Sequence, residues 1–473
     1  MKTLILPVLI CLITVNITKV EAQNFNTATI DTVANYVASL QYTNNSLPSY
    51  GAIKKTTVSG VFNGISYFSI EPYFNHIACL GILQSNLNTK CDVAKHWMTW
   101  YLNHLNNKGQ TLNHYYKADG SGETTCPNGS TGSYCNNIDA EDSDPALFWM
   151  LARRYFIKTN DLSFFTPTVK VKLETAAQFL IDSLIQPDHL SIAKRNYAIK
   201  YTMDNSEVYQ GLLSLSYIEN SIYGDVTKAN YYLSKANLTK TAIKTLLYNS
   251  TNNLYNHYLG GITDSTQWYQ SGVAATVWPQ LFEVDNFSDA RSIRQRTVLN
   301  NNFNGTSNIN WTSQAFLGTV DAFTWASIGY VFSLAGDSTK GYAQANYIGP
   351  LFVAPYPYAP CYVADAGWLM MNMSLKFPAT NCGLATMVQK VDYNEQTILI
   401  YPNPTTNHLS ISGHNLLLNS EIIITNIIGE TVIKNIIQDE MTIINTSKLL
   451  KGFYTLSISK DRKVLIQKKI IIE

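Results

Sequence analysis

The sequence predicts a mainly α-helical fold, a six-hairpin α/α toroid, followed by a small C-terminal all-β sandwich domain. Two observations carry this prediction. Up to about Val391, apolar residues recur at helical spacing, whereas later runs such as "EIIITNI" and "YTLSIS" alternate like half-buried strands. The expected helices also alternate between members rich in small and aromatic residues and members rich in Lys, Arg, Asn and Gln, as expected for an enclosed layer inside a solvated one.

The toroid is expected over residues 23–387, a linker over 388–395 and the β domain over 396–473. The helical segments run from "ATIDTVANYVASLQ" to "YVADAGWLMMNMSLKF" and number about twelve. If the last helix pairs with the first, the hairpins close into a double-layered ring whose inner helices are mutually parallel. The N-termini of the inner helices then meet at one rim, where a binding site is expected.

Composition limits the classes of partner. With 46% hydrophobic and 14% charged residues among 473, the chain can bury large cores and is long enough for two or three domains. The formal charge of +1 and the lack of a basic cluster argue against nucleic acid or an anionic membrane as the main partner. Thirty Tyr and eight Trp suit an uncharged, hydrated ligand such as a sugar, and they equally suit a Tyr-rich core.

The N-terminal segment has the three regions of a secretory signal peptide, predicted over residues 1–22. It has a basic start at Lys2, an apolar run from Leu4 to Val15 and small or polar residues near Ala22. No later apolar run reaches the roughly 20 residues that cross a bilayer, so no membrane span is expected. The mature chain is therefore predicted to be exported through the periplasm.

The cysteines suggest disulfides in this oxidising compartment. The predicted signal peptide contains Cys11, and the remaining cysteines are even in number, which permits three bridges. Other pairings are open to the sequence, but the local grouping suggests Cys79–Cys91, Cys126–Cys135 and Cys361–Cys382.

The C-terminal β runs carry a specific pattern. "IYPNPTTNHLSI", "IGETV", "LLKGFYTLSI" and "KVLIQKKIIIE" closely resemble the type A C-terminal sorting domain of the type IX secretion system. The resemblance implies that the type IX machinery is a partner, and that the protein is then secreted or attached to the cell surface. An accessory carbohydrate-binding β-sandwich is the alternative.

Acidic or aromatic residues stand at or just ahead of the start of each predicted inner helix. In a closed ring they would converge on one cavity, where one carboxyl group can protonate a glycosidic oxygen while another activates water or attacks the sugar. These residues are Glu71, Asp142, Asp144, Asp204, Glu207, Trp268, Tyr269, Asp321 and Asp365.

Helix capping is the competing explanation for these acids. A capping carboxylate accepts free backbone N–H groups and stabilises a helix by about 0.5–2 kcal/mol. Asp204 and Glu207 fit a capping box, and Asp144 before Pro145 fits an N-cap. Capping explains Glu71 poorly, because Glu is not a favoured cap residue, and it leaves the acid two residues before Asp144 unexplained. The predicted catalytic carboxylates are Glu71, Asp142 and Asp204, and the predicted substrate-binding acids are Asp144, Glu207 and Asp321.

Two segments resemble a known enzyme family. "SIEPYFNHIACLGIL" and "IDAEDSDPALFWMLARRYFIKTND" look like motifs of family eight glycoside hydrolases, and the central region resembles the six-hairpin glycosidase superfamily. The resemblance implies that Glu71 is the proton donor and that Asp142 and Asp144 lie in the sugar-binding and base region. Pro72 departs from the family motif, and "MDNSEVYQGL" and "VWPQLFEV" fit other six-hairpin groups better. A secreted glycoside hydrolase is therefore predicted, without a choice between retaining and inverting stereochemistry.

Aromatic rings near the same helix starts are candidate platforms for sugar rings, and part of them is expected to fill the core instead. Trp268 and Tyr269 lie between Gln267 and Gln270, which suggests exposed rings. The predicted substrate-binding aromatics are Tyr209, Trp268, Tyr269, Trp278 and Trp325.

Other chemistries receive less support. Asn113, His114 and Tyr115 resemble the group with which helical-toroid polysaccharide lyases abstract a proton, so a lyase is one alternative and a non-catalytic glycan-binding protein is another. The histidines show no HExxH spacing. The segment from Asp119 to Glu123 lacks a full Ca²⁺-loop pattern, so no metal or cofactor is predicted.

Overall fold

The computed structural model describes residues 27–84, 90–305, 308–353 and 361–376, and from 399 to 472 all but 402, 413–416, 418, 427–429, 439–440 and 461–462. The predicted signal peptide and linker lie outside these residues. No helix in the described part of the chain combines the length and apolarity needed to cross a membrane.

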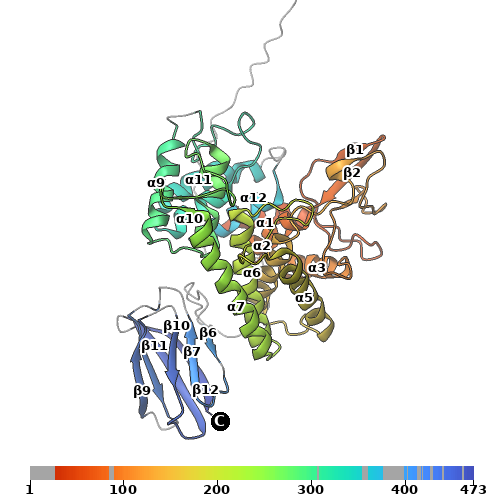
Figure 1. Cartoon of the computed structure of the whole chain (residues 1–473). Coiled ribbons are helices and arrows are strands. Elements are labelled where there is room, and N and C mark those ends of the chain that lie inside the picture. Colours follow the sequence, from red (N-terminus) through yellow and green to blue (C-terminus); the bar gives the residue numbers. More distant parts are fainter. Residues whose placement is uncertain are drawn as a thin grey trace, which may run out of the picture.

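The segments with helical spacing form helices (Figure 1). Short π-helical turns follow or replace several of them, at Leu180–Leu184, Ile243–Leu247 and Trp268–Ala274. The α-helices are α1 (Thr27–Ser39), α2 (Pro72–Ile82), α3 (Lys90–Asn103), α4 (Ser143–Thr159), α5 (Pro167–Phe179), α6 (Thr202–Ser221), α7 (Val226–Ala242), α8 (Trp278–Leu281), α9 (Ala290–Asn302), α10 (Ala326–Leu334), α11 (Ser338–Val353) and α12 (Val363–Ser374).

The even-numbered helices contact one another in succession. Helix α2 packs on α4, α4 on α6, α6 on α8, α8 on α10 and α10 on α12, and α12 packs on α2. The odd-numbered helices lie against them, with α3 on α2 and α4, α7 on α6, and α1 and α11 on α12. Helix α12 is buried along its whole length, whereas α9 buries only four residues, Ser292, Gln295, Val298 and Leu299. The alternation of small and aromatic with polar segments thus corresponds to an inner and an outer layer.

Two glycines allow α2 and α12 to approach closely. A Cβ atom added to Gly81 would come within 3.0 Å of the Gly367 backbone, and one added to Gly367 would come equally close to the carbonyl group of Ile77. Cβ atoms do not tolerate such contacts, so these positions require glycine. The first and last inner helices can therefore pack this closely only because Gly81 and Gly367 have no side chains.

The strand that leads into α2 belongs to a three-stranded antiparallel sheet. Its strands are β1 (Gly60–Phe62), β2 (Ile65–Ile70) and β3 (His114–Tyr116), in the order β1-β2-β3. Strand β2 ends immediately before Glu71, and its last residues pair with β3 in the register Ser69–Tyr115 and Ile70–His114. The sheet therefore positions the residue that precedes α2.

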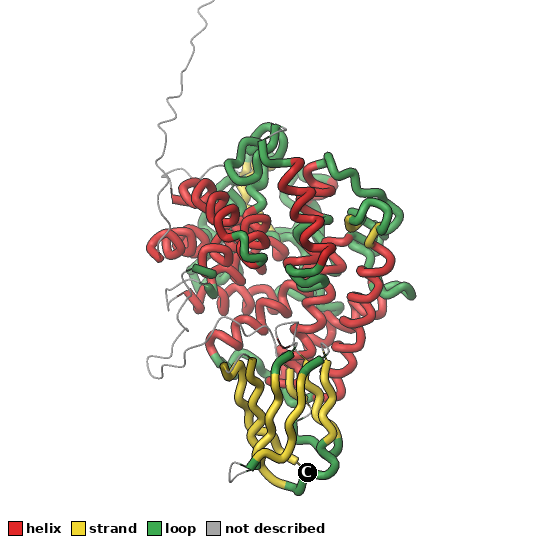
Figure 2. The backbone as a smooth tube through the Cα atoms, turned by 90° about the vertical axis from the view of Figure 1, so that its left-hand side faces the viewer, coloured by secondary structure: helices red, strands yellow, loops and turns green. Residues whose placement is uncertain are grey.

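The C-terminal runs form two antiparallel sheets, and Figure 2 shows them as yellow strands joined by green loops, next to the C-terminus. One has the order β10-β7-β6 and the other β12-β11-β8-β9. Alternate residues such as Ile411, Ile422, Ile424, Leu456 and Ile458 share one apolar core, as in a sandwich. The strands are β6 (Leu399–Tyr401), β7 (His408–Ser412), β8 (Glu421–Thr425), β9 (Thr431–Ile436), β10 (Met441–Asn445), β11 (Gly452–Lys460) and β12 (Lys463–Ile472); β4 (Tyr248–Asn249) and β5 (Leu254–Tyr255) form a hairpin in the helical part.

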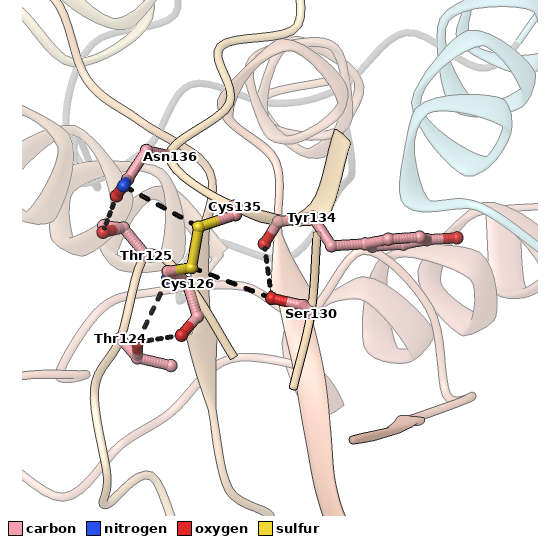
Figure 3. Close-up of a disulfide and its surroundings, with 7 residues drawn as sticks. All are labelled: Thr124, Thr125, Cys126, Ser130, Tyr134, Cys135 and Asn136. Atoms are coloured by element: carbon pink, nitrogen blue, oxygen red, sulfur yellow. Dashed lines mark hydrogen bonds between the residues drawn. A yellow bond between two sulfur atoms is a disulfide. The ribbon is translucent and has the colours of Figure 1, made fainter. Parts of the chain in front are cut away.

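The cysteine pairing differs from the prediction. Cys126–Cys135 is confirmed, and Figure 3 shows it beside the Thr125 hydroxyl, which donates to the Asn136 side-chain oxygen at 2.6 Å. Cys79 and Cys361 are buried free thiols, so the pairs predicted for them are wrong. Cys91 is disulfide-bonded, and Cys382 lies outside the described residues. Sequence proximity fails for Cys79 because the phase of α2 directs its side chain into the core.

Glu219, near the end of α6, is a buried carboxyl group away from the helix starts. It has no exposed side-chain surface, and its nearest cation is the Lys170 ammonium, 3.4 Å away. Burial raises the pKa of Glu219 to about 7. In the unfolded chain a Glu releases its proton near pH 4.3.

We expect Glu219→Gln to stabilise the protein at pH 8. Between the unfolded pKa and about pH 7 the folded state keeps a proton that the unfolded state has lost, so the stability of the wild type falls as the pH rises through this range. Gln does not ionise, so the variant avoids this loss of stability. Its free energy of unfolding should exceed that of the wild type by about 1–3 kcal/mol at pH 8 but differ little from it at pH 4. Denaturant unfolding at both pH values measures the difference, and an equal change at the two would contradict the assignment.

Candidate active site

A cavity of about 970 Å³ lies at the N-terminal ends of the inner helices. Its wall contains Tyr73 from α2, Asp204 from α6 and Asp365 from α12, together with residues of the segments before α4 and α10. The volume is in the range of small-molecule binding sites. The carboxylates in the wall are Glu71, Asp139, Asp204, Asp321 and Asp365, and the rings are Tyr73, Phe74, Tyr197, Tyr201, His257, Tyr269, Trp278, Phe323, Trp325 and Trp368.

Glu71 occupies the N-cap position of α2 but does not cap it. Its side chain accepts no hydrogen bond from the helix, and Pro72 takes the first helical position. Oε1 instead accepts from Lys55 Nζ and from Ser69 Oγ, each at 2.6 Å. Charge-assisted hydrogen bonds of this kind are short and strong. Lys55 and Ser69 therefore fix the Glu71 side chain at the edge of the cavity.

Asp204 lies in the first turn of α6, which begins at Thr202 with Tyr201 as its N-cap. The predicted capping box is wrong, because the helix starts earlier than the acid pattern suggested and Glu207 lies inside it. The Asp204 side chain faces the cavity. Burial raises its pKa well above the usual value, and the charges of Asp142, Glu207 and Asp139 raise it further.

Asp142 and Asp144 lie outside the cavity wall. Helix α4 starts at Ser143, so Asp142 is the N-cap and accepts from the Ser143 N–H at 2.9 Å and from the Ser191 hydroxyl; the N-cap predicted at Asp144 is wrong. Burial raises the pKa of Asp142 to about 7. Asp144 accepts from the Tyr101 hydroxyl at 2.9 Å and pairs with His76 at 3.2 Å. Both acids support the start of α4 from within the core.

Glu207 is fully buried directly behind the cavity wall. Its Oε1 accepts from the Tyr73 hydroxyl at 2.7 Å and from Trp278 Nε1 at 2.8 Å, and both of these rings line the cavity. Burial raises the pKa of Glu207 to about 7. Glu207 therefore orients two wall rings and adds to the electrostatic cost of ionising Asp204.

Asp139 is a wall carboxylate that the sequence reasoning missed. Its side chain reaches the solvent of the cavity, and the surrounding protein and the Glu71 charge raise its pKa, while Lys194 and Lys55 act in the opposite direction. Asp139 begins the acid-rich run "DAEDSD". The prediction selected the later acids of this run because they lie nearer the start of α4. Asp365 was noted at a helix start without a role; burial raises its pKa to about 6.

The aromatic predictions divide between wall and core. Tyr269, Trp278 and Trp325 line the cavity, and Tyr269 is 43% exposed. Trp268 was expected to be exposed but is buried, because it packs on Phe303 and Phe316. Tyr209 lies in the core with the Lys240 ammonium 5.1 Å from its ring centre, so neither it nor Trp268 forms part of the wall.

Asp321 connects the buried Trp268 with the half-buried Trp325. Its Oδ2 accepts from Trp268 Nε1 at 3.1 Å and from Trp325 Nε1 at 2.6 Å. Trp325 precedes α10 with a positive φ of 48°, a strained conformation for a bulky residue. Asp321 thus fixes the orientation of a wall ring, in addition to facing the cavity itself.

The residues proposed for a lyase do not contribute to this wall. Asn113, His114 and Tyr115 are buried in and beside β3, and His114 pairs with Glu123 at 3.0 Å. Among the described residues two groups bring possible metal ligands within 4.8 Å of one another, and neither lines the cavity. They are His104, His114 and Glu123, and Glu174, Glu219 and Asp225.

The two parts of the chain match different known proteins. Residues 399–473 match the secretion system C-terminal sorting domain family, which confirms the resemblance to the type IX tail and indicates secretion or export to the cell surface. No curated protein sequence matches the chain.

The helical part is similar to solved glycosidase structures. Two variants of a glycosidase, one of them in complex with glucose, each share 10% sequence identity with this chain. The matches cover 75% of this chain and 99% of theirs, with TM-scores of 0.50 and 0.51. At this identity the likeness concerns the fold alone: the helical part has a glycosidase-like fold.

Proposed function

We propose that the protein is a secreted glycoside hydrolase, in which a closed six-hairpin toroid over residues 23–387 binds a poly- or oligosaccharide and residues 396–473 direct export. The observation that carries the proposal is the convergence of five carboxylates and several aromatic rings on one cavity at the helix starts. The contact of α12 with α2 supports ring closure, and the glycosidase-like fold supports the reaction class.

Asp204 is proposed as the general acid, which protonates the glycosidic oxygen as the bond breaks. A general acid must carry its proton at the working pH, which requires a raised pKa. Burial and three neighbouring carboxyl groups raise the pKa of Asp204 well above its usual value. The buried Asp142 and Glu207 behind it act as positioning residues, since they contribute to this shift without reaching the cavity.

Asp139 is proposed as the base or nucleophile. Its side chain is open to the cavity, and within the described part of the chain no side chain forms a hydrogen bond or ion pair with its oxygens, so they can meet water or the sugar. Glu71 also lines the cavity, but its Oε1 already accepts from Lys55 and Ser69. We therefore assign Glu71 to holding Lys55 and binding substrate rather than to proton donation.

The wall rings are proposed to bind the sugar faces. Tyr269, Trp278, Trp325 and Trp368 come from separate segments and surround the acids, so a pyranose ring can stack on them while its hydroxyl groups meet the carboxylates. The nearly even balance of acidic and basic residues in the whole chain agrees with an uncharged glycan.

A glycan panel tests the proposal. The mature protein should release reducing sugar from at least one neutral glycan, and Asp139→Asn should lower kcat by about 10²–10⁴-fold. Glu71→Gln should mainly raise KM, and Asp182→Asn, at an exposed outer position, should leave both constants unchanged. Azide should restore turnover to Asp139→Ala, because a small anion can take the place of the missing nucleophile or base.

The products distinguish the alternatives. Proton NMR of the first-formed sugar shows whether the anomeric configuration is retained or inverted. Unsaturated products would contradict hydrolysis and point to a lyase. Saturable glycan binding without any turnover would contradict an enzyme and point to a binding protein.

A further inference from the structure

His104, His114 and Glu123 form a compact cluster away from the cavity. His104 directly follows α3, His114 begins β3 and Glu123 lies in the loop beyond it. Glu123 Oε1 is 3.0 Å from His104 Nε2 and 3.0 Å from His114 Nδ1. The two imidazole side chains are 16% and 10% exposed and the carboxylate is 30% exposed, so an ion in solution can reach the cluster.

The backbone brings the three side chains to one face. Tyr115 and Thr124 exchange two backbone hydrogen bonds, at 2.8 and 3.1 Å, which places Glu123 opposite Tyr116 in an antiparallel ladder. His114 and Tyr116 are two residues apart and therefore share a face of the ladder with Glu123. Trp100 stacks on His104 at 4.1 Å and meets the edge of His114 at 5.2 Å, which holds both imidazoles in place.

The contacts of His104 match those of a metal-binding histidine. Its Nδ1 lies 2.7 Å from the Trp100 carbonyl oxygen, and its Nε2 faces the Glu123 carboxylate. When Nδ1–H donates to the carbonyl, Nε2 offers its lone pair on the side of Glu123, where a cation can be bound by both groups. Metal-binding histidines commonly donate their other N–H to a carbonyl in this way.

We propose that His104 Nε2, His114 Nδ1 and Glu123 bind a divalent first-row transition ion, best suited to Zn²⁺. Two imidazoles and one carboxylate are ligands that zinc accepts, whereas Ca²⁺ and Mg²⁺ prefer oxygen ligands. Ligand atoms around tetrahedral zinc lie about 3.3 Å apart, given Zn–N and Zn–O distances of about 2.0–2.1 Å. The two 3.0 Å separations are within a few tenths of an ångström of this spacing. Water completes the coordination.

The metal ties the end of α3 to β3. Strand β3 pairs with β2, whose Ser69 donates to Glu71 at 2.6 Å. The ion therefore braces the sheet that carries the chain into the cavity, and its role is structural. It also accounts for the polar loop from Asp119 to Glu123, which returns Glu123 to the histidines.

The test measures zinc on the untagged mature protein after chelation and dialysis. We expect one equivalent of Zn²⁺ to rebind, the thermal midpoint to rise by about 3 °C or more, and Co²⁺ to give the visible bands of a tetrahedral site without a thiolate band, since Cys79 and Cys361 are buried. Glu123→Gln should weaken zinc binding by about 100-fold or more. Glu174→Gln, from the other acidic cluster, should bind zinc like the wild type.

If Glu123→Gln does not fold, the measurements on the wild-type protein alone still decide the test. A wild type that rebinds no zinc, shows no Co²⁺ bands and keeps the same midpoint overturns the proposal, as does equal zinc affinity in Glu123→Gln. Metal content and midpoint do not depend on glycan cleavage, so this result is independent of the proposed enzyme activity.

Discussion

Asp204→Asn is expected to lower kcat on a natural glycan by about 10³-fold, because the amide cannot protonate the leaving oxygen. The loss should be much smaller on an aryl glycoside with an acidic phenol, since such a leaving group departs without protonation. Parallel kinetics on the two substrates measure the ratio. Equal losses on both would contradict a general acid and indicate a binding or folding defect.

The pH profile gives a second readout of the same variant. Wild-type activity should fall on the alkaline side as Asp204 loses its proton, and this limb should lie well above the ordinary range of an Asp because burial and neighbouring carboxyl groups raise the pKa. Asp204→Asn should lose the alkaline limb and keep the acid limb that we assign to Asp139. Asp92→Asn, at an exposed position on α3, is the matched control and should leave the profile unchanged.

Gly81→Ala and Gly367→Ala are each expected to lower the free energy of unfolding by about 1–3 kcal/mol, as overpacked cores do. The added methyl group would strike the backbone of the facing helix, which cannot rotate away as a side chain can. A loss of stability would be informative, because alanine in a helix is intrinsically more favourable than glycine by about 1 kcal/mol. Without the steric clash, each substitution would stabilise the protein. Urea denaturation with a thermal melt measures both variants.

The control for these glycines is an alanine substitution on the outer layer. Ser234→Ala, at an exposed position of α7, should change stability by less than about 0.5 kcal/mol. The effects of the two glycine variants should not add, since the residues face each other. Stabilisation by either alanine would mean that α2 and α12 do not approach as described, and ring closure would lose its main support.

The candidate site could be predicted from sequence to the level of the helix starts but not to the individual acid. Asp139 and Asp142 lie three residues apart in one acidic run, yet the first faces the cavity and the second is buried as an N-cap. Which of several acids caps α4 depends on the residue at which its first turn begins, and the local pattern does not fix that residue. The role of Lys55 beside Glu71 had no sequence signal, because β2 and its connection bring them together.

Burial explains the other differences. Trp268 has polar neighbours in sequence, but its ring packs on Phe303 and Phe316, which come from later in the chain. Cys79 lies near Cys91 in sequence, but α2 directs its thiol into the core. In both cases the decisive contacts are with distant residues, and no local pattern records them.

By itself the sequence determined the helical and β-strand regions, the two kinds of helix and the sorting tail, because side-chain periodicity and motif spacing are local properties of the chain. Only the tertiary structure decided which carboxyl groups share the cavity and which of them resist ionisation. The pKa of Asp204 depends on burial and on charges contributed by Asp139, Asp142 and Glu207. Those distances exist only once the helix starts have been brought together, since electrostatic energy depends on separation in space and not along the chain.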